Sequence, residues 1–408
     1  MPRVLVGIPR LELGGMQINA LDMARAVRDL GHEVHLFAER EPSMPMLDIA
    51  RGHGFEIELL EPSDRHVRRL APRIGRLVRR HGADVIHAHG TWLGWGAFLG
   101  PCRRWGTPLV TTVYTMDVPH WIPRTPHLIV GTQELAEEAR TWYRGPVWMI
   151  EPPVDTTLDR PGAVDPSGFT SAHDLDPRLL RVVIVSRLAW EMKFEPIERA
   201  IAAVEQLGRR DVQLVIVGEG EAEDRVRQLA AEANARLGRR AVVVTGALAD
   251  PRPAYEAASL MIGQGGSAIR TLAFGKPLIV AAEGGFSLPF TESTRDVFFQ
   301  QGFYGYDNGR VPVSRLAGQI QDLLDDAGGL QALGKLGRAI VEERYSLQAA
   351  GRQLERIYLE SVGAPRSRWD WLVEAAYTTS YRAAGRMMPG GLRRSVRALL
   401  PGRLRRAG

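Results

Sequence analysis

Two cationic side chains follow a strand-like run in the second half of this 408-residue sequence. Arg187 stands directly after RVVIVS (181–186), and Lys193 comes six residues later. Fixed positive charge at the end of a buried strand can hold an anion and stabilise negative charge that develops on a leaving group. The alternative is two solvated surface charges. We favour the anion site, partly because Lys193 is one of only three lysines in a chain that otherwise uses arginine.

A loop of small residues occurs in GQGGSAIRTLAFGKP (263–277). Gly265, Gly266 and Ser267 stand immediately before a helix that we expect to begin near Ala268. Such a loop leaves backbone N–H groups free to face a phosphate, and the N-terminus of a helix favours negative charge. The alternative is a tight loop packed by the neighbouring structure.

Other turns also follow strand-like runs. Gly14 and Gly15 come after VLVGI (4–8) and open the first expected helix, where glycine allows close approach to the backbone. An ordinary strand-to-helix turn is the alternative. Two more turns, one centred on Glu219 and one running from Gly246 to Leu248, end later strands, and any sheet of alternating strands and helices needs such turns.

The elements that must position these residues alternate along the chain. We expect strands at 4–8, 33–38, 84–89, 108–113, 127–132 and 147–152, with helical patterns between them. A stretch rich in Pro, Asp and Gly at 152–178 reads as a linker. The alternation then restarts, with strands expected at 181–188, 212–220, 241–248, 259–263 and 277–282. This pattern predicts an α/β protein with two similarly built halves, each a parallel sheet with helices on both faces, and a cleft between them.

Six segments, taken in order, resemble family 4 glycosyltransferases over roughly residues 3–360. They are LELGGMQINALDMARAVRDLGHEVHLFA, DVIHAHG, IEPPVDTTLDRP, SRLAWEMKF, VIVGEGE and LAFGKPLIV. The resemblance implies the GT-B fold, in which two Rossmann-like domains face each other across a cleft. It also implies transfer of a sugar from a nucleotide-sugar donor, with retention at the anomeric carbon and without a metal or other cofactor.

The resemblance assigns roles to the residues above. Arg187 and Lys193 would hold the donor diphosphate. The place of His89 at the end of the strand at 84–89, rather than the resemblance, suggests that it contacts the sugar or the acceptor. His87 on the same strand is expected to face the other way and to be structural. The remaining donor-binding residues would be Gly14, Gly15, Glu219, Gly246, Leu248, Gly265, Gly266 and Ser267. We expect Arg270 to bind the donor too, although it departs from the family pattern.

Three positions depart from the family pattern, and all concern the donor sugar. Tyr114 stands where the family often has a histidine; it can donate a hydrogen bond but cannot act as an imidazolium. Ile262 and Arg270 stand where the family has two glutamates. Arginine has no acceptor for ribose hydroxyls, although it can bind a phosphate or a carboxylate. An active enzyme is our main hypothesis. A non-catalytic binding partner and a nucleotide-sugar epimerase are the alternatives.

Charge and composition set further limits. From Arg382 to the end the chain has eight arginines and no acidic residue, which predicts either a solvated tail or contact with an anionic membrane surface. The rest of the chain does not resemble a nucleic-acid binder. One cysteine, Cys102, and the lack of a long apolar run or a signal peptide favour a cytoplasmic protein. We expect domains at 1–165 and 166–345, a helix at 346–365 that packs back on the first domain, and a basic aromatic tail at 366–408.

Overall fold

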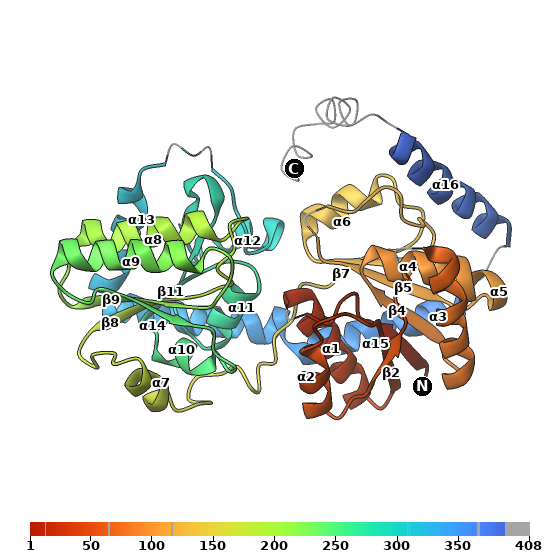
Figure 1. The fold of residues 1–408 in the computed structure, drawn as a ribbon, viewed down its shortest axis with the longest axis horizontal. Helices are drawn as coiled ribbons and strands as arrows, with labels where there is room; N and C mark the ends of the chain where they lie inside the picture. The colour runs from red at the N-terminus through yellow and green to blue at the C-terminus, as the bar shows by residue number, and fades with distance from the viewer. Residues whose placement is uncertain are drawn as a thin grey trace. The chain divides into compact units, whose positions relative to one another are not determined.

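The structure, a computed structural model, describes residues 1–12, 14–63, 66–115, 117–307, 309, 311–364 and 368–387, without the side chains of Arg368 and 382–387. The predicted basic segment beyond Met387 therefore lies outside the described residues. The chain forms two compact units: unit 1 comprises Met1–Pro153 and the chain from Leu347 onward, and unit 2 comprises Val154–Ser346 (Figure 1). The predicted α/β class is confirmed, since each unit holds a sheet in which helices alternate with strands.

Unit 1 contains, within the described residues, a parallel sheet in the order β3-β2-β1-β4-β5-β6-β7. Its strands are β1 (Arg3–Gly7), β2 (Glu33–Glu39), β3 (Ile57–Leu60), β4 (Val85–His89), β5 (Leu109–Val113), β6 (His127–Val130) and β7 (Val147–Met149). Its helices are α1 (Gly15–Asp29), α2 (Met46–Gly52), α3 (Val67–His81), α4 (Thr91–Ala97), the π-helical turn η1 (Phe98–Cys102), α5 (Arg103–Trp105), α6 (Gln133–Arg140), α15 (Leu347–Gly363) and α16 (Arg368–Met387).

Unit 2 contains a sheet in the order β10-β9-β8-β11-β12-β13, parallel except for β13. Its strands are β8 (Leu180–Val185), β9 (Val212–Val217), β10 (Val242–Gly246), β11 (Leu260–Gly263), β12 (Leu278–Ala281) and β13 (Ser287–Pro289). Its helices are α7 (Ser167–Ala172), α8 (Phe194–Leu207), α9 (Glu223–Leu237), α10 (Arg252–Ala257), α11 (Gly266–Ala273), η2 (Glu283–Gly285), α12 (Arg295–Gln301), α13 (Val313–Asp325), α14 (Ala327–Ile340) and η3 (Val341–Tyr345).

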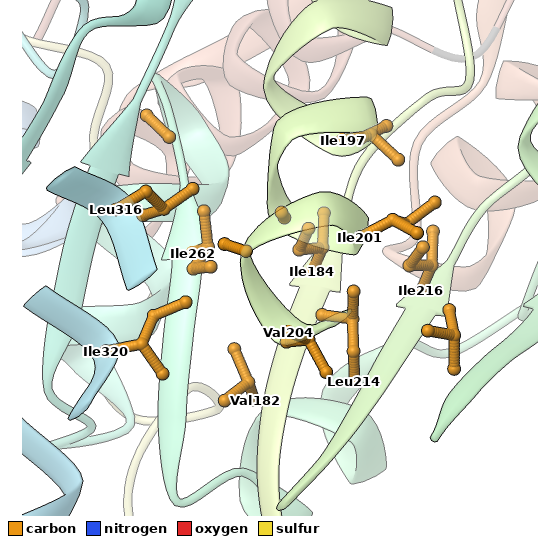
Figure 2. Close-up of a cluster of buried hydrophobic side chains, with 14 of the residues drawn as sticks. Val182, Ile184, Ile197, Ile201, Val204, Leu214, Ile216, Ile262, Leu316 and Ile320 are labelled. Carbon is orange, nitrogen blue, oxygen red and sulfur yellow. The ribbon is translucent and has the colours of Figure 1, made fainter. Parts of the chain in front are cut away.

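The side chains of each strand fill cores on both faces of its sheet, because successive residues of a strand point to opposite faces. In unit 2, Val182 and Ile184 of β8 pack under α8 and α13, as Figure 2 shows, while Val183 between them packs toward α7 and α10. In unit 1, α1 and α15 cover one face of the sheet, and α3 and α4 cover the other. Both sheets are therefore rigid supports for the loops at their strand ends.

In the structure unit 2 begins at Val154, which is earlier than the domain boundary predicted at residue 165. Residues 154–159 belong to unit 2, because Arg338 of α14 donates hydrogen bonds to the carbonyls of Thr156 (2.9 Å) and Asp159 (2.7 Å). The stretch expected to be a linker also contains helix α7. Helix α15 lies in unit 1, where Leu354 and Ile357 pack in the core with α1. No described helix is long and apolar enough to cross a membrane.

Candidate active site

A small open hollow lies at the carboxyl ends of β8 and β11 in unit 2. Its lining includes Ser186 after β8, Lys193 before α8, and Gln264 and Ser267 around the start of α11. In parallel sheets of this kind, ligands bind at the carboxyl ends of the strands. The hollow thus brings together two of the sequence-predicted residues, Lys193 and Ser267, with two polar residues that the sequence interpretation did not single out.

The loop that carries Lys193 is fixed from two sides. The Met192 N–H donates to a carboxylate oxygen of Glu283 (3.1 Å), and the Met192 carbonyl accepts from the Gln264 side-chain amide (2.7 Å). Met192 has φ of 63°, a left-handed conformation that is strained for a residue other than glycine. Glu195 of α8 accepts from the Gly284 N–H (2.9 Å) and ties the same loops together. The backbone is thus held in an unfavourable conformation immediately before the candidate lysine.

The charge on Lys193 is poorly compensated by its surroundings. Burial and the nearby Arg187 guanidinium lower the pKa of Lys193 to about 8, and the Glu283 carboxylate offsets only part of that effect. Arg187 is exposed and has no ion-pair partner among the described residues. Arg187 and Lys193 share one loop, and each disfavours the positive charge of the other. A bound anion would therefore stabilise both charges.

The predicted glycine turns meet at the same edge of the sheet. The Gly218 N–H donates to the Gly246 carbonyl (2.9 Å), and the Glu219 carbonyl accepts from the Leu188 N–H (2.8 Å), next to Arg187. Gly218 has φ of 145°, and a Cβ there would lie 1.8 Å from the Ser186 carbonyl oxygen. The Leu248 side chain is partly buried and packs against the core cluster that includes α10.

The glycines at the starts of α1 and α11 differ in whether the surrounding structure would accept a larger residue. Gly265 has φ of 58°, and a Cβ there would lie 2.3 Å from the Tyr304 hydroxyl oxygen, so local packing requires glycine. A Cβ at Gly15 or Gly266 would meet nothing within 4 Å. Gly14 is extended, and its Cβ would meet only the flexible side chain of Gln17. Open space at the first residue of each helix leaves room for a ligand to approach the backbone.

Arg270 lies in an ion pair within unit 2 and is not part of the hollow's lining. Its Nε donates to a carboxylate oxygen of Asp159 at 2.8 Å, and the Asp159 side chain is 5% exposed against 30% for Arg270. Burial raises the pKa of Asp159, and Arg270 offsets this only in part. The carboxylate that Arg270 binds is thus supplied by the chain itself, in the segment that follows the crossing from unit 1.

The two histidines of β4 lie on the same face of the sheet, so the prediction that they face opposite ways is wrong. Residues two apart in a strand share a face, and the rings of His87 and His89 are 4.2 Å apart. His87 hydrogen-bonds Tyr358 (2.6 Å) and Thr112 (2.7 Å). His89 is fully buried, and neither ring nitrogen has a partner among the described residues. Burial lowers the pKa of His89 to about 3, which keeps the ring neutral.

Tyr114 is directed toward the backbone of its own unit. Its hydroxyl donates to the Ile150 carbonyl at 2.9 Å. Burial and the neighbouring Glu151 hold the pKa of Tyr114 well above its usual range, so the proton stays on the oxygen. With that proton engaged, the hydroxyl can accept a hydrogen bond from a sugar but cannot donate one. Tyr114 and His89 belong to unit 1, and Lys193 and Arg187 to unit 2.

Two family profiles match the chain. One described as Glycosyltransferase Family 4 matches residues 13–158, and one described as Glycosyl transferases group 1 matches residues 180–326. The first match falls almost wholly in unit 1 and the second falls in unit 2.

Curated relatives share up to 29% identity. A phosphatidyl-myo-inositol mannosyltransferase of Mycolicibacterium smegmatis is 29% identical over 54% of this chain, and the match spans only 58% of that relative's length. A D-inositol 3-phosphate glycosyltransferase of Thermobispora bispora is 25% identical, over 86% of this chain and 91% of the relative.

Solved glycosyltransferases share the fold. A glycosyltransferase from Rickettsia africae superposes with a TM-score of 0.72 at 15% identity, over 89% of this chain and 99% of the other. Anabaena HepE in complex with UDP gives a TM-score of 0.65 at 17% identity, over 87% and 98%. At these identities the likeness establishes the GT-B fold and no more.

Proposed function

The chain belongs to glycosyltransferase family 4, and from that premise we propose that it transfers a hexosyl unit from a nucleotide-sugar donor, with retention at the anomeric carbon. The acceptor would be a glycan, a lipid-linked sugar or a small molecule. Relatives named for transfer to phosphatidyl-myo-inositol and D-inositol 3-phosphate support an acceptor that carries hydroxyl groups. Structural neighbours solved with UDP, or with UDP-glucose, support a nucleoside diphosphate as the leaving group.

One observation carries the proposal: the poorly compensated ammonium of Lys193, beside Arg187, lines a hollow at the carboxyl ends of two strands. Breaking the bond between the anomeric carbon and the diphosphate places negative charge on the leaving group. A cation on a loop that is already fixed, as Lys193 is, stabilises that charge with little reorganisation, and Arg187 adds a second positive charge. We therefore place the donor diphosphate against Lys193 and Arg187, with no bound metal in the reaction.

The other predicted residues take supporting roles in this proposal. The open backbone at Gly266 and the Ser267 hydroxyl would face a phosphate, and the turns at Glu219 and Gly246 would surround the base. Retention requires the acceptor to attack from the side that the leaving group vacates. In this proposal the departing phosphate takes the acceptor proton on that same face. In this proposal the chain therefore needs no carboxylate base.

We place the protein in the cytoplasm, at the inner face of a membrane, with the basic segment 382–408 toward the anionic lipids. This location suits a lipid-linked or envelope acceptor. The proposed location does not depend on the proposed reaction, because a membrane-bound enzyme could also use a soluble acceptor.

Donor affinity is expected to depend on pH through Lys193. Only the protonated ammonium attracts the diphosphate, so affinity should be constant up to about pH 8 and then fall, approaching tenfold per pH unit. Calorimetric titration of a donor between pH 7 and 9.5 measures this. Lys193→Arg should remove the dependence, because arginine stays protonated throughout. An equal fall in Lys193→Arg would show that another group controls binding.

A non-catalytic binding partner is the second candidate, and the pairing of Arg270 with Asp159 is the observation that favours it. A panel of nucleotide sugars, screened by thermal shift and then by product release, separates the candidates. A donor that raises the melting temperature and releases nucleoside diphosphate supports transfer. Binding without turnover supports the non-catalytic partner, and conversion of the donor to an epimer without an acceptor supports an epimerase.

A further inference from the structure

Tyr304 lies close to the hollow in unit 2, although it is not part of the hollow's lining. It belongs to the segment between α12 and α13. The Gly265 N–H donates to the Phe303 carbonyl at 2.7 Å, which ties this segment to the residue immediately before α11. Phe303 is itself buried in a cluster with Phe290 and Phe298. The backbone that leads into Tyr304 is therefore fixed both to the core and to the start of α11.

The hydroxyl of Tyr304 is the part of that side chain nearest to Gly265. A Cβ added at Gly265 would lie 2.3 Å from the hydroxyl oxygen, 2.7 Å from the ring carbon that bears it and 3.2 Å from the next ring carbon. Gly265 is the N-cap residue of α11, and it stands between Gln264 and Ser267, which both line the hollow. The hydroxyl thus lies beside the N-terminus of α11.

Three hydrogen-bond donors at this helix end have no acceptor among the residues that the structure describes. They are the N–H groups of Gly266 and Ser267, which precede the first intrahelical bonds, and the Tyr304 hydroxyl. The Tyr304 side chain is largely buried, and burial raises the pKa of its hydroxyl, so the proton is retained at neutral pH. A hydroxyl without a hydrogen bond in the fold contributes little to stability, but it can donate to an anion.

The ring of Tyr304 lies beside Lys193. The Lys193 Nζ is 6.0 Å from the ring centroid, which is at the outer limit of a cation–π contact. Because the ring faces Lys193 and the hydroxyl adjoins Gly265, Tyr304 connects the candidate lysine with the N-terminus of α11. These are the two groups against which the donor diphosphate is placed above.

We propose that the Tyr304 hydroxyl donates a hydrogen bond to the donor diphosphate, which makes Tyr304 a further donor-binding residue. This inference rests on the proposed function, since it takes the diphosphate to lie against Lys193 and the start of α11. A hydrogen bond to a charged phosphate oxygen is stronger than one between neutral groups. The contact involves only the phosphates, so the nucleoside should be bound equally well without it.

Tyr304→Phe tests this inference, because it removes the hydroxyl and keeps the ring. Calorimetric titration of the full chain with UDP, GDP, ADP, CDP and dTDP first identifies the nucleoside diphosphate that the wild-type protein binds most tightly. Tyr304→Phe should raise the Kd for that ligand about 10- to 100-fold. The Kd for the corresponding nucleoside, measured by ligand-detected NMR, should stay unchanged. The melting temperature without ligand should also stay unchanged, since the hydroxyl makes no hydrogen bond in the fold.

The matched control is Tyr306→Phe, which makes the same change two residues later, on a side chain that is 53% exposed. It should leave the Kd of the nucleoside diphosphate unchanged. If Lys193→Ala weakens binding and Tyr304→Phe does not, the inference about Tyr304 is overturned while the proposed function stands. An equal loss for the nucleoside, or a lower melting temperature without ligand, would assign Tyr304 to folding and overturn the inference too. If the wild-type chain binds none of the five diphosphates, the inference and the proposed function both fail.

Discussion

Lys193→Ala is expected to lower transfer to the acceptor by about 10²- to 10³-fold, the usual loss when one preorganised group that stabilises developing charge is removed. The physical reason is that Arg187 alone, on an exposed side chain, would remain to face the departing diphosphate. The loss should appear in kcat, since the charge on the leaving group is greatest in the transition state. Release of nucleoside diphosphate under saturating donor measures it.

Two controls separate a role in the reaction from a role in folding. Lys335→Ala removes an exposed lysine elsewhere in unit 2 and should leave kcat unchanged. Lys193→Arg retains the charge but changes its reach, and it should keep more activity than Lys193→Ala. Undiminished activity in Lys193→Ala would show that the donor diphosphate lies elsewhere.

Arg270→Ala is expected to lower the stability of unit 2 by about 1–3 kcal/mol at neutral pH. Removing one partner of a buried ion pair costs about 3–5 kcal/mol, and the partial exposure of Arg270 reduces that figure. The carboxylate of Asp159 would remain nearly buried without a countercharge. The melting temperature should fall by about 2–12 °C, since 1 kcal/mol corresponds to roughly 2–4 °C in a unit of this size.

The loss of stability in Arg270→Ala should depend on pH. Burial already raises the pKa of Asp159 in the folded protein, and loss of Arg270 would raise it further. A carboxyl group whose folded pKa is raised destabilises the fold above that pKa, so the deficit should be larger at pH 8 than at pH 5. Asp159→Asn in the Arg270→Ala background should recover most of the lost stability, because a neutral amide needs no countercharge.

Arg270→Glu tests whether Arg270 stands in place of a contact to the donor. It places a second carboxylate beside Asp159, so it should be less stable than Arg270→Ala and should not improve donor binding. Tighter donor binding in Arg270→Glu would instead mark Arg270 as a lost ribose contact and would strengthen the non-catalytic candidate.

The fold could be predicted from the sequence because its strands are apolar on both faces. Runs such as RVVIVS and VQLVIV are typical of parallel strands covered by helices on two sides, and the structure has them as β8 and β9. The helix α7 and the attachment of residues 154–159 were not predicted. The composition of that stretch indicates turns, and only the contacts of Arg338 and Arg270 reveal that it packs on α11 and α14.

Parts of the site were harder to predict than the fold. Lys193 could be singled out because a lysine is rare in this chain and follows a strand. Glu283 and Gln264 support it from loops far away in sequence. The position of Gln264 directly after β11, and of Glu283 shortly after β12, could have indicated residues at the same edge of the sheet. For His89, the place at a strand end suggested contact with the sugar or the acceptor, and only the structure shows that its side chain is completely buried.

The crossings between the units also have a consequence for how this chain is assembled. Unit 2 is one continuous segment, Val154–Ser346, inserted into unit 1, and its two ends meet where the Val154 N–H donates to the Tyr345 carbonyl at 2.9 Å. An inserted segment with adjacent ends can leave its host without stretching the chain on either side. The adjacent ends predict that unit 2 can be removed and the two segments of unit 1 rejoined with little change in the path of the chain.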